Sequence, residues 1–227
     1  MDAATGDVRW DVEAYTHSER SWAEAAMSPD GRFVASIGGD VPHWKLWDVE
    51  SGALHRAGPT HDGSGACICG APVLDQPLVV QEGCPVVAHT KRILALALSP
   101  CGQWLATGGR DAEVILWDAR TWEAAHRMTG NSQTVTCLSF SADGARLASG
   151  WDGYRDGVND DEDDDEDDMV HTGEIRVWDT ATGALLHFFP DFLGGVECVY
   201  FAPTINSILV FAGSEQSGVG DIDRGEV

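Results

Sequence analysis

The sequence predicts an all-β fold built from repeated units of short strands. Three observations predict it: a Trp-Asp pair ends an apolar run three times, a strand-turn-strand phrase recurs along the chain, and 26 of the 227 residues are glycine. Glycine at this frequency suits tight turns, and the apolar runs are bounded by Gly, Pro, Asp or Ser, as strands commonly are. A chain of this length can bury roughly 70% of its unfolded surface, so we expect a packed core.

The Trp-Asp pair is the first element of the repeat. It closes the runs WKLWD at 44–48, VILWD at 114–118 and IRVWD at 175–179. Each run has the length and the branched or aromatic side chains of a strand, and the Asp stands where the strand should stop. One such pair could be a coincidence, whereas three indicate a repeat.

The strand-turn-strand phrase is the second element of the repeat. Its copies begin AMSPDG, LSPCGQ and FSADGA, and a degenerate copy begins FAPTIN. Equivalent turn positions are 71, 42 and 61 residues apart, and the middle spacing gives the length of one unit. The two longer spacings place insertions at 58–87 and 151–172, and the second insertion contains the acidic run DDEDDDEDD at 160–168.

A unit of about 42 residues with four short strands resembles the WD-repeat β-propeller family. The resemblance implies a β-propeller of WD-repeat type with about four blades, in which the strands of each unit follow in the order d, a, b, c. WD-type rings usually close with about seven blades, so we expect the array to be incomplete or completed by another chain. We expect one domain over 1–227, with repeat units at roughly 1–47, 48–117, 118–178 and 179–223.

The resemblance also implies a hydrogen-bonded network in each blade. It joins a His before strand a, a Ser or Thr on strand b, an Asp in the b–c turn and the Trp on strand c. Such groups need partners once water is excluded, and a hydroxyl that recurs within a strand in every unit suits structure better than nucleophilic catalysis. The positions that match are His89, Thr107, Asp111 and Trp117, then His17, Ser36, Asp40 and Trp47, and in a third, incomplete set Ser149 and Trp178.

The strongly negative net charge argues against nucleic acids and anionic membranes as direct partners. The formal net charge is -23, with 14 basic against 37 acidic residues, whereas nucleic acids and anionic membranes are bound through clustered Lys and Arg. The longest aliphatic run, ILALAL at 93–98, is far shorter than the ~20 residues of a membrane span. We therefore expect no direct contact with nucleic acid or membrane, and an intracellular location, cytoplasmic or nuclear. The six cysteines are expected to be reduced.

The first insertion leaves an alternative function open. Residues 58–89 include Cys67, Cys69, Cys84 and His89, which could make a metal-binding or enzymatic module. The C-x-C spacing is not the usual C-x2-C, so we expect no metal site and no cofactor. A further alternative is a non-functional fragment of a longer propeller. The acidic run lacks the order of an EF-hand loop, and we expect it to be disordered.

We predict a non-catalytic scaffold for protein–protein interaction. In a four-stranded blade the d–a and b–c connections emerge at the same end of the strands, so both insertions should project from one face. Loops on a rigid scaffold carry recognition residues, and an acidic loop attracts basic partners. The expected partners are proteins or peptides, possibly basic ones, with self-association or the remaining blades of a longer chain as a further possibility. The candidate partner-binding residues are Arg92, Arg110, Trp151, Tyr154, Asp161, Asp164 and Asp167.

Overall fold

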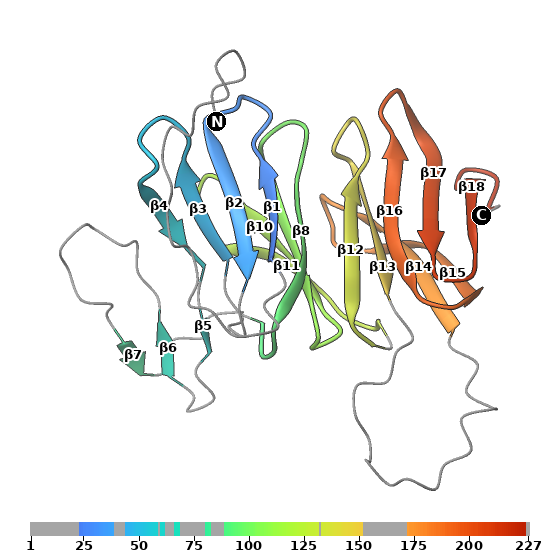
Figure 1. Ribbon diagram of the computed structural model, residues 1–227, viewed down its shortest axis with the longest axis horizontal. Coiled ribbons are helices and arrows are strands. Elements are labelled where there is room, and N and C mark those ends of the chain that lie inside the picture. The colour runs from blue at the N-terminus through green and yellow to red at the C-terminus, as the bar shows by residue number, and fades with distance from the viewer. Residues whose placement is uncertain are drawn as a thin grey trace, which may run out of the picture.

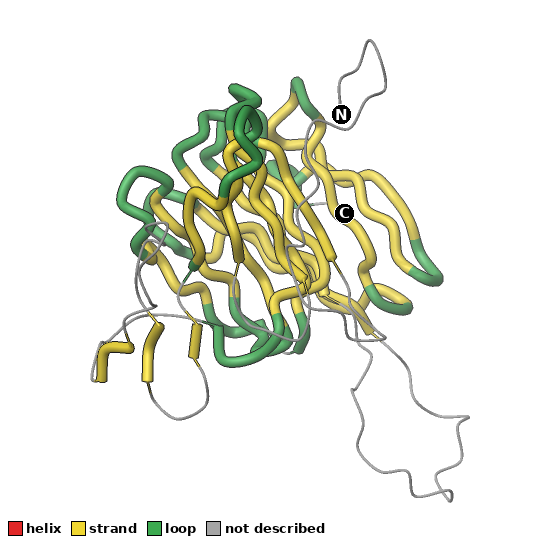
Figure 2. Tube along the Cα trace, turned by 60° about the vertical axis from the view of Figure 1, so that its left-hand side comes forward, coloured by secondary structure: helices red, strands yellow, loops and turns green. Residues whose placement is uncertain are grey.

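The computed structural model describes most of the repeat array. The described part consists of strands joined by turns, with no helix in it (Figure 2). A search of these residues accordingly finds no helical segment of the length and apolarity needed to cross a membrane. The described residues are 23–38, 44–58, 60–61, 66–68, 80–82, 89–131, 133–151 and 172–225.

Sheet 1 has four antiparallel strands that pair in chain order. The turn between its first two strands places Gly31 at a φ of 70°, a conformation that costs glycine little because it lacks a Cβ. The apolar run at 44–48 forms the third strand and ends at the Asp, as the sequence predicts. The strands are β1 (Ala23–Met27), β2 (Phe33–Gly38), β3 (Trp44–Asp48) and β4 (Leu54–Ala57).

Sheets 2 and 3 repeat this arrangement. In both, the first three strands correspond to the recurring phrase and to the run that ends in Trp-Asp. Sheet 2 contains β8 (Ile93–Leu98), β9 (Trp104–Gly109), β10 (Val114–Asp118) and β11 (Ala124–Met128). Sheet 3 contains β12 (Val135–Phe140), β13 (Arg146–Trp151), β14 (Thr172–Asp179) and β15 (Leu185–Leu193).

Sheet 4 has three described strands, and the degenerate last repeat still forms them. The segment SGVGD, a worn match to the third strand of a unit, pairs with β17 over five residue pairs. The first insertion contains a small separate sheet of three very short strands. Sheet 4 contains β16 (Val196–Ala202), β17 (Ile205–Gly213) and β18 (Ser217–Asp221), and the insertion contains β5 (Thr60–His61), β6 (Ala66–Ile68) and β7 (Val80–Glu82).

The four main sheets stand side by side, with sheet 1 and sheet 4 at opposite ends of the row (Figure 1). Their first strands, β1, β8, β12 and β16, are neighbours in that order. Hydrogen bonds join them: the Leu96 amide donates to Glu24 at 2.9 Å, and the Thr136 hydroxyl donates to the Val196 carbonyl at 2.6 Å. The chain is therefore an all-β array of antiparallel sheets packed face to face.

Three apolar cores fill the joints between successive sheets. Burial of each large apolar side chain contributes about 1.5–3 kcal/mol, so these joints carry most of the hydrophobic stabilisation. Fully buried members are Ala35, Leu46, Leu105 and Ile115 between sheets 1 and 2, Ala106, Leu116 and Leu147 between sheets 2 and 3, and Ala148, Val177 and Leu209 between sheets 3 and 4.

A glycine allows close approach at the third joint. A Cβ on Gly150 would lie 2.6 Å from the Cys137 sulfur and 2.7 Å from a methyl carbon of Val196. The second strand of sheet 3 can therefore meet the first strand of sheet 4 only where it has no side chain. The same spacing argument explains why the repeat carries Gly108 after the hydroxyl residue of sheet 2, where a Cβ would clash with Val135.

Two expectations about the chain's organisation need separate treatment. The second insertion, expected at 151–172, is shorter, because β13 runs through Trp151 and β14 begins at Thr172. Residues 1–22, which begin the first expected repeat unit, lie outside the described residues.

Candidate interaction surface

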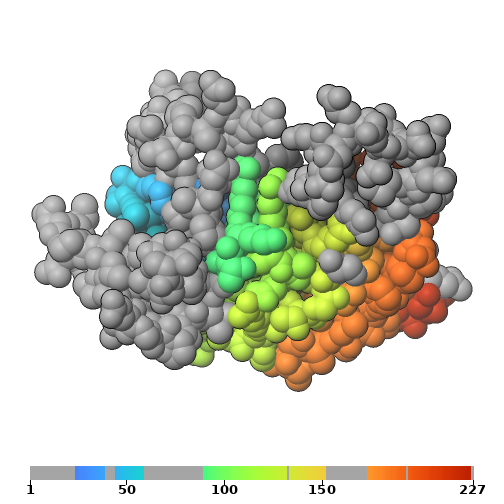
Figure 3. All heavy atoms as spheres, turned by 90° about the horizontal axis from the view of Figure 1, so that it is seen from below, coloured from blue at the N-terminus to red at the C-terminus, as the bar shows by residue number. Residues whose placement is uncertain are grey.

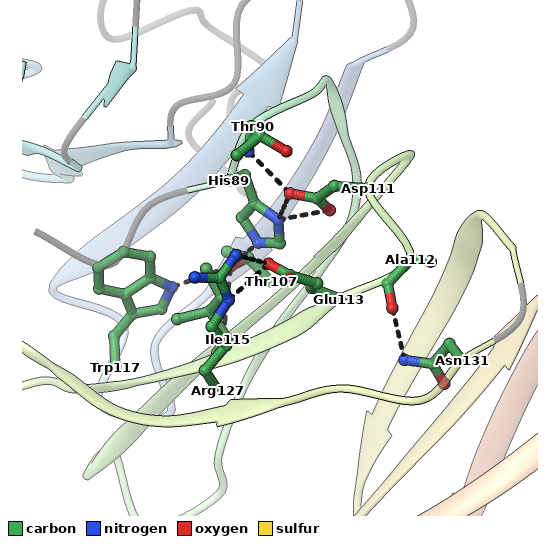
Figure 4. Close-up of polar contacts among 10 residues, drawn as sticks. All are labelled: His89, Thr90, Thr107, Asp111, Ala112, Glu113, Ile115, Trp117, Arg127 and Asn131. Carbon is green, nitrogen blue, oxygen red and sulfur yellow. Dashed lines mark hydrogen bonds and ion pairs between the residues drawn. The ribbon is translucent and has the colours of Figure 1, made fainter. Parts of the chain in front are cut away.

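Four side chains of sheet 2 form a continuous polar network (Figure 4). The indole nitrogen of Trp117 donates to the Thr107 hydroxyl at 2.9 Å. That hydroxyl lies 2.8 Å from Nε2 of His89, whose Nδ1 is 2.9 and 3.0 Å from the two carboxylate oxygens of Asp111. Because Nδ1 faces a carboxylate, it carries the proton of the neutral ring, and Nε2 accepts from Thr107. The backbone amide of Thr90 completes the network by donating to Asp111 at 2.8 Å.

This network is closed to solvent. His89 is 1%, Thr107 0% and Trp117 2% exposed. Burial by itself would raise the pKa of Asp111, but hydrogen bonds from His89 and Thr90 outweigh it, and the pKa lies below the usual value. Every polar atom thus has a neighbour within the sheet, which satisfies groups that would be costly to bury alone. The arrangement fixes strands β8, β9 and β10 to one another.

Sheets 1 and 3 each contain the hydrogen bond from the Trp indole to a hydroxyl of the neighbouring strand. Trp47 donates to Ser36 at 2.8 Å, and Trp178 donates to Ser149 at 2.9 Å. His17 and Asp40, which complete the expected set in sheet 1, lie outside the described residues.

In sheet 3 an asparagine takes a different role at the position of the histidine. The Asn131 side-chain amide donates to the Ala112 carbonyl of the preceding sheet at 3.1 Å (Figure 4). It therefore links two sheets rather than two strands of one sheet, and Ser149 is held by the Trp alone among the described residues.

Sequence reasoning missed a set of serines that lock the short turns. In sheets 1, 2 and 3 the serine that precedes the first turn accepts a hydrogen bond at 2.9 Å from an amide five residues later. Two of these serines, Ser99 and Ser141, are fully buried. The signal was present, because a Ser recurs in AMSPDG, LSPCGQ and FSADGA. The three serines are Ser28, Ser99 and Ser141.

The Asp of each Trp-Asp pair has a similar structural role. Asp48 accepts from the Ser51 hydroxyl and amide at 2.7 and 2.8 Å, and Asp179 accepts from Thr182 in the same way. These bonds hold the pKa of both carboxyl groups below the usual range. In sheet 2 the Asp118 carboxylate accepts from two backbone amides of the turn instead. The sequence predicts that the strand ends at this Asp. In the structure the Asp carboxylate accepts hydrogen bonds from the residues of the turn that follows.

Both insertions leave the sheets at one end, which we call the rim: the end at which β4 and β13 finish and β8 and β14 begin (Figure 1). Figure 3 views the molecule from this side, where sheets 2 and 3 run from green through yellow to orange. The Arg110 amide donates to the Arg92 carbonyl at 2.9 Å, so the turn after β9 lies against the start of β8. Arg110 is exposed and Arg92 is half-buried.

Of the other predicted partner-binding residues, Trp151 is buried and four lie outside the described residues. Trp151 is 5% exposed, because it is the last residue of β13 and pairs with Val135 and Glu174. Its ring is therefore buried against the sheets and is not exposed to a partner, as an aromatic anchor would be. Four more predicted residues lie outside the described residues: Tyr154, Asp161, Asp164 and Asp167.

A hollow of about 350 Å³ lies along the first strands of the four sheets. Glu24 lines it, and burial raises the pKa of this carboxyl from 4.5 to about 7, although the bond from the Leu96 amide acts in the opposite direction. Cys137 also lines the hollow, and burial raises the pKa of its thiol to about 12, so the thiol stays protonated at neutral pH. A protonated, buried thiol is a poor nucleophile. Across the described residues, no three His, Cys, Asp or Glu side chains converge as a metal site requires.

Comparison with known proteins identifies the type of repeat in two segments of the chain. The model of the WD domain, G-beta repeat, matches residues 83–118 and 122–157. The chain therefore contains WD40 repeats in these two segments. The first match covers β8 to β10, including the complete polar network of sheet 2, and the second covers β11 to β13.

The similar curated proteins include plant proteins named as U3 snoRNP-associated. The chain is 45% identical over 133 residues to the U3 snoRNP-associated protein-like YAO of Arabidopsis thaliana, which is 57% of this chain and 24% of that protein. It is 48% identical over 66 residues to the U3 snoRNP-associated protein-like EMB2271 of the same organism, which is 29% of this chain and 14% of that protein. The chain thus spans less than a quarter of the length of these relatives.

Solved structures agree on the fold. The RRP9 WD40 repeats match with a TM-score of 0.58 at 19% identity, over 89% of this chain and 52% of that one. The structure of U3-55K matches with a TM-score of 0.56 at 18% identity, over 87% of this chain and 50% of that one. At these identities the likeness concerns the fold alone, and this WD40 chain spans about half of each solved chain.

Proposed function

We propose that the protein is a non-catalytic scaffold that binds other proteins or peptides at the rim. The observation that carries the proposal is the asymmetry between the two ends of the sheets. At the end opposite the rim, the turns in sheets 1 to 3 are short and held by serine and aspartate hydrogen bonds. At the rim, both long insertions depart from the sheets (Figure 1). Variable loops on a rigid support are the usual place for recognition.

The chemistry of the buried polar groups favours binding over catalysis. A nucleophile and its base need access to substrate. Here the hydroxyl and the imidazole of Thr107 and His89 are buried and bonded to other side chains of the same sheet. The same indole–hydroxyl pair recurs in sheets 1 and 3, which a structural role explains and a single active site does not.

Charge indicates the class of partner. With a net charge of -23, the chain attracts cationic surfaces and repels phosphate backbones. The relatives named as U3 snoRNP-associated support a partner within a ribonucleoprotein. Both points fit a basic protein of such a particle, contacted without direct binding to its RNA. An intracellular location that includes the nucleus follows from this proposal.

The acidic run at 160–168, which includes Asp161, Asp164 and Asp167, is the proposed source of the attraction for a basic partner. The test is fluorescence anisotropy with a labelled peptide rich in Lys and Arg, titrated with the intact chain and with a chain lacking 156–168. We expect the deletion to weaken binding at least tenfold and to flatten its dependence on salt, with an unchanged melting temperature. A matched control keeps the loop length and replaces the acids of 160–168 by Asn and Gln, and it should behave as the deletion does.

Substitutions of two arginines at opposite ends of sheet 2 test where the proposed binding face lies. Arg110 lies in the turn at the rim, whereas Arg120 lies in the turn at the other end, where its side chain is 80% exposed. Arg110→Glu should strengthen binding of the basic peptide, because it adds negative charge at the rim, and Arg120→Glu should change it less. Equal effects, or an RNA oligonucleotide that binds more tightly than the peptide, would contradict the proposal.

A further inference from the structure

A hollow of about 250 Å³ lies between sheets 1 and 2, at the end of the strands opposite the rim. It belongs to a joint that two complete four-stranded sheets already form. Its apolar walls come from both sheets, with Phe33 and Leu46 on one side and Leu98 and Trp122 on the other. Asp30, in the turn between β1 and β2, also lines it. A space of this size suits one long side chain better than a drug-sized molecule.

The hollow exists because side chains are smaller at this joint than at the next one. Leu98, the last residue of β8, is half-buried, whereas Phe140 at the same position of β12 is 8% exposed. Ala119 follows the Asp of the Trp-Asp pair in sheet 2. At the same position of sheet 3, Thr180 is 3% exposed and donates to the Gly144 carbonyl at 2.8 Å. Smaller side chains at the first joint therefore leave a space that larger ones fill at the second.

Trp122 stands where the repeat otherwise has a glycine. Gly52 in sheet 1 and Gly183 in sheet 3 have φ values of 69° and 72°, and each amide donates to an Asp carbonyl four residues earlier. Trp122 has a φ of 62° and makes the same bond, although residues with a Cβ rarely adopt this conformation. Its half-buried ring lies 5.2 Å from the Trp44 ring, centroid to centroid. Strain of this kind is typical of ligand sites, and here it brings a large aromatic ring to the hollow.

The carboxylate of Asp30 has an oxygen that can accept a hydrogen bond from a ligand. Its Oδ1 accepts from the Ser28 hydroxyl at 2.6 Å and from the Arg32 amide at 3.1 Å. In the equivalent turn of sheet 3, Oδ1 of Asp143 is bonded in the same way, and Oδ2 accepts from the Asn206 side-chain amide of sheet 4 at 2.7 Å. Within the described residues, Oδ2 of Asp30 has no such donor. The first joint therefore lacks an N–H group that the third joint supplies.

The charges around the hollow favour a cation in that place. The hydrogen bond from Ser28 holds the pKa of Asp30 below its usual value, so this carboxyl is ionised at neutral pH. The nearby cation, Arg32, is exposed and lies 5.3 Å from the centroid of the Phe33 ring. It is outweighed by the net charge of -23, which attracts positive groups. A guanidinium stacks on aromatic rings and donates to carboxylates, while its aliphatic stem covers apolar walls.

We propose that the hollow between sheets 1 and 2 is a second binding site, which takes an arginine side chain of a partner protein. The stem of the arginine lies against Phe33 and Leu98. Its guanidinium stacks on Trp122 and donates to Oδ2 of Asp30, as Asn206 donates to Asp143 in the third joint. This site is at the opposite end of the sheets from the rim, so it is separate from the acidic run.

The test is a titration of the full, isotope-labelled chain with a short peptide that has one arginine among glycines and serines, followed by NMR. The indole signal of Trp122, identified by its absence in Trp122→Gly, should shift on binding. The same peptide with citrulline in place of arginine keeps the shape and loses the charge. It should bind about tenfold more weakly, because the hydrogen bond to the carboxylate is no longer charge-assisted.

Four variants locate the site and its chemistry. Asp30→Asn should weaken binding of the arginine peptide about tenfold, whereas Asp143→Asn, the matched control in sheet 3, should leave it unchanged. Arg32→Gln should strengthen binding about threefold, because it removes the competing cation. Trp122→Gly introduces the residue that sheets 1 and 3 have at this position, so the chain should fold. Binding to it, followed at the amide of Gly102 in the hollow, should be lost. Circular dichroism shows whether each variant is folded.

Five results would overturn the proposal. They are equal affinity for the citrulline peptide, equal affinity for a norleucine peptide, tighter binding of free arginine than of the arginine peptide, full affinity in Asp30→Asn, and loss of affinity in Asp143→Asn. The chain lacking 156–168 should bind the arginine peptide as the intact chain does. Loss of binding in that chain would assign the peptide to the acidic run and would also overturn the proposal, so failure here and failure at the rim are distinguishable.

Discussion

The hydroxyl of Thr107 is the centre of the polar network, and its removal tests the network directly. It accepts from the Trp117 indole at 2.9 Å and lies 2.8 Å from Nε2 of His89. Thr107→Val keeps the shape of the side chain and its β-branching, so it leaves no cavity in β9. The substitution removes the hydroxyl that is, among the described residues, the only partner of the Trp117 indole and of Nε2 of His89.

The expected loss of stability follows from the number of buried polar groups left without a partner, which is two. Leaving a buried donor or acceptor unpaired costs about 1–3 kcal/mol, so two of them cost about 2–6 kcal/mol. With a denaturant slope of about 2 kcal/mol per molar urea, the unfolding midpoint of the affected region falls by about 1 M or more. Because repeat arrays can unfold in parts, hydrogen exchange of the amides in β8, β9 and β10 should show the loss locally.

Thr90→Val is the matched control, because Thr90 is exposed and contributes only its backbone amide to the network. Its urea midpoint should stay near that of the wild-type chain. If Thr107→Val proves as stable as Thr90→Val, the hydroxyl does not hold the sheet together and the reasoning is refuted.

Three further predictions concern other joints of the array. Ser149→Ala should destabilise sheet 3 by about 1–3 kcal/mol in urea unfolding, because the buried indole of Trp178 loses its acceptor. Gly150→Ala should cost about 1–3 kcal/mol and raise hydrogen exchange in β16, since the new Cβ would lie 2.7 Å from Val196. The folded-state pKa of Glu24 is raised from 4.5 to about 7, so its ionisation weakens the fold as pH rises through that interval. Glu24→Gln should therefore leave the urea midpoint unchanged at pH 4.5 and raise it at pH 8, and an equal shift at both values would contradict the raised pKa.

The repeat made much of the fold predictable. A Trp-Asp pair, a hydroxyl in the preceding strand and a short turn recur at constant offsets, so each unit confirms the interpretation of the others. The spacing also predicts both insertions, since they interrupt an otherwise constant period. Even the worn last unit follows the pattern, because β18 pairs with β17 although it has no Trp.

Other features could not be predicted, because they depend on neighbouring sheets. Asn131 bonds to a carbonyl of the preceding sheet, a contact that no pattern within one unit encodes. The position of Trp151 directly before the acidic segment predicts a loop, but strand pairing extends through it. The raised pKa of Glu24 arises from burial against the next sheet, whereas the sequence shows only an acidic residue in a short alanine-rich strand.

We propose that the rim with the acidic run binds a basic protein partner, and a salt series of binding affinities is the decisive test. The affinity of the labelled Lys- and Arg-rich peptide is measured across a salt series for the intact chain and for the chain lacking 156–168. We expect the intact chain to bind more tightly at every salt concentration and to lose affinity more steeply as salt rises. Equal affinities and equal salt dependence for the two chains would contradict it.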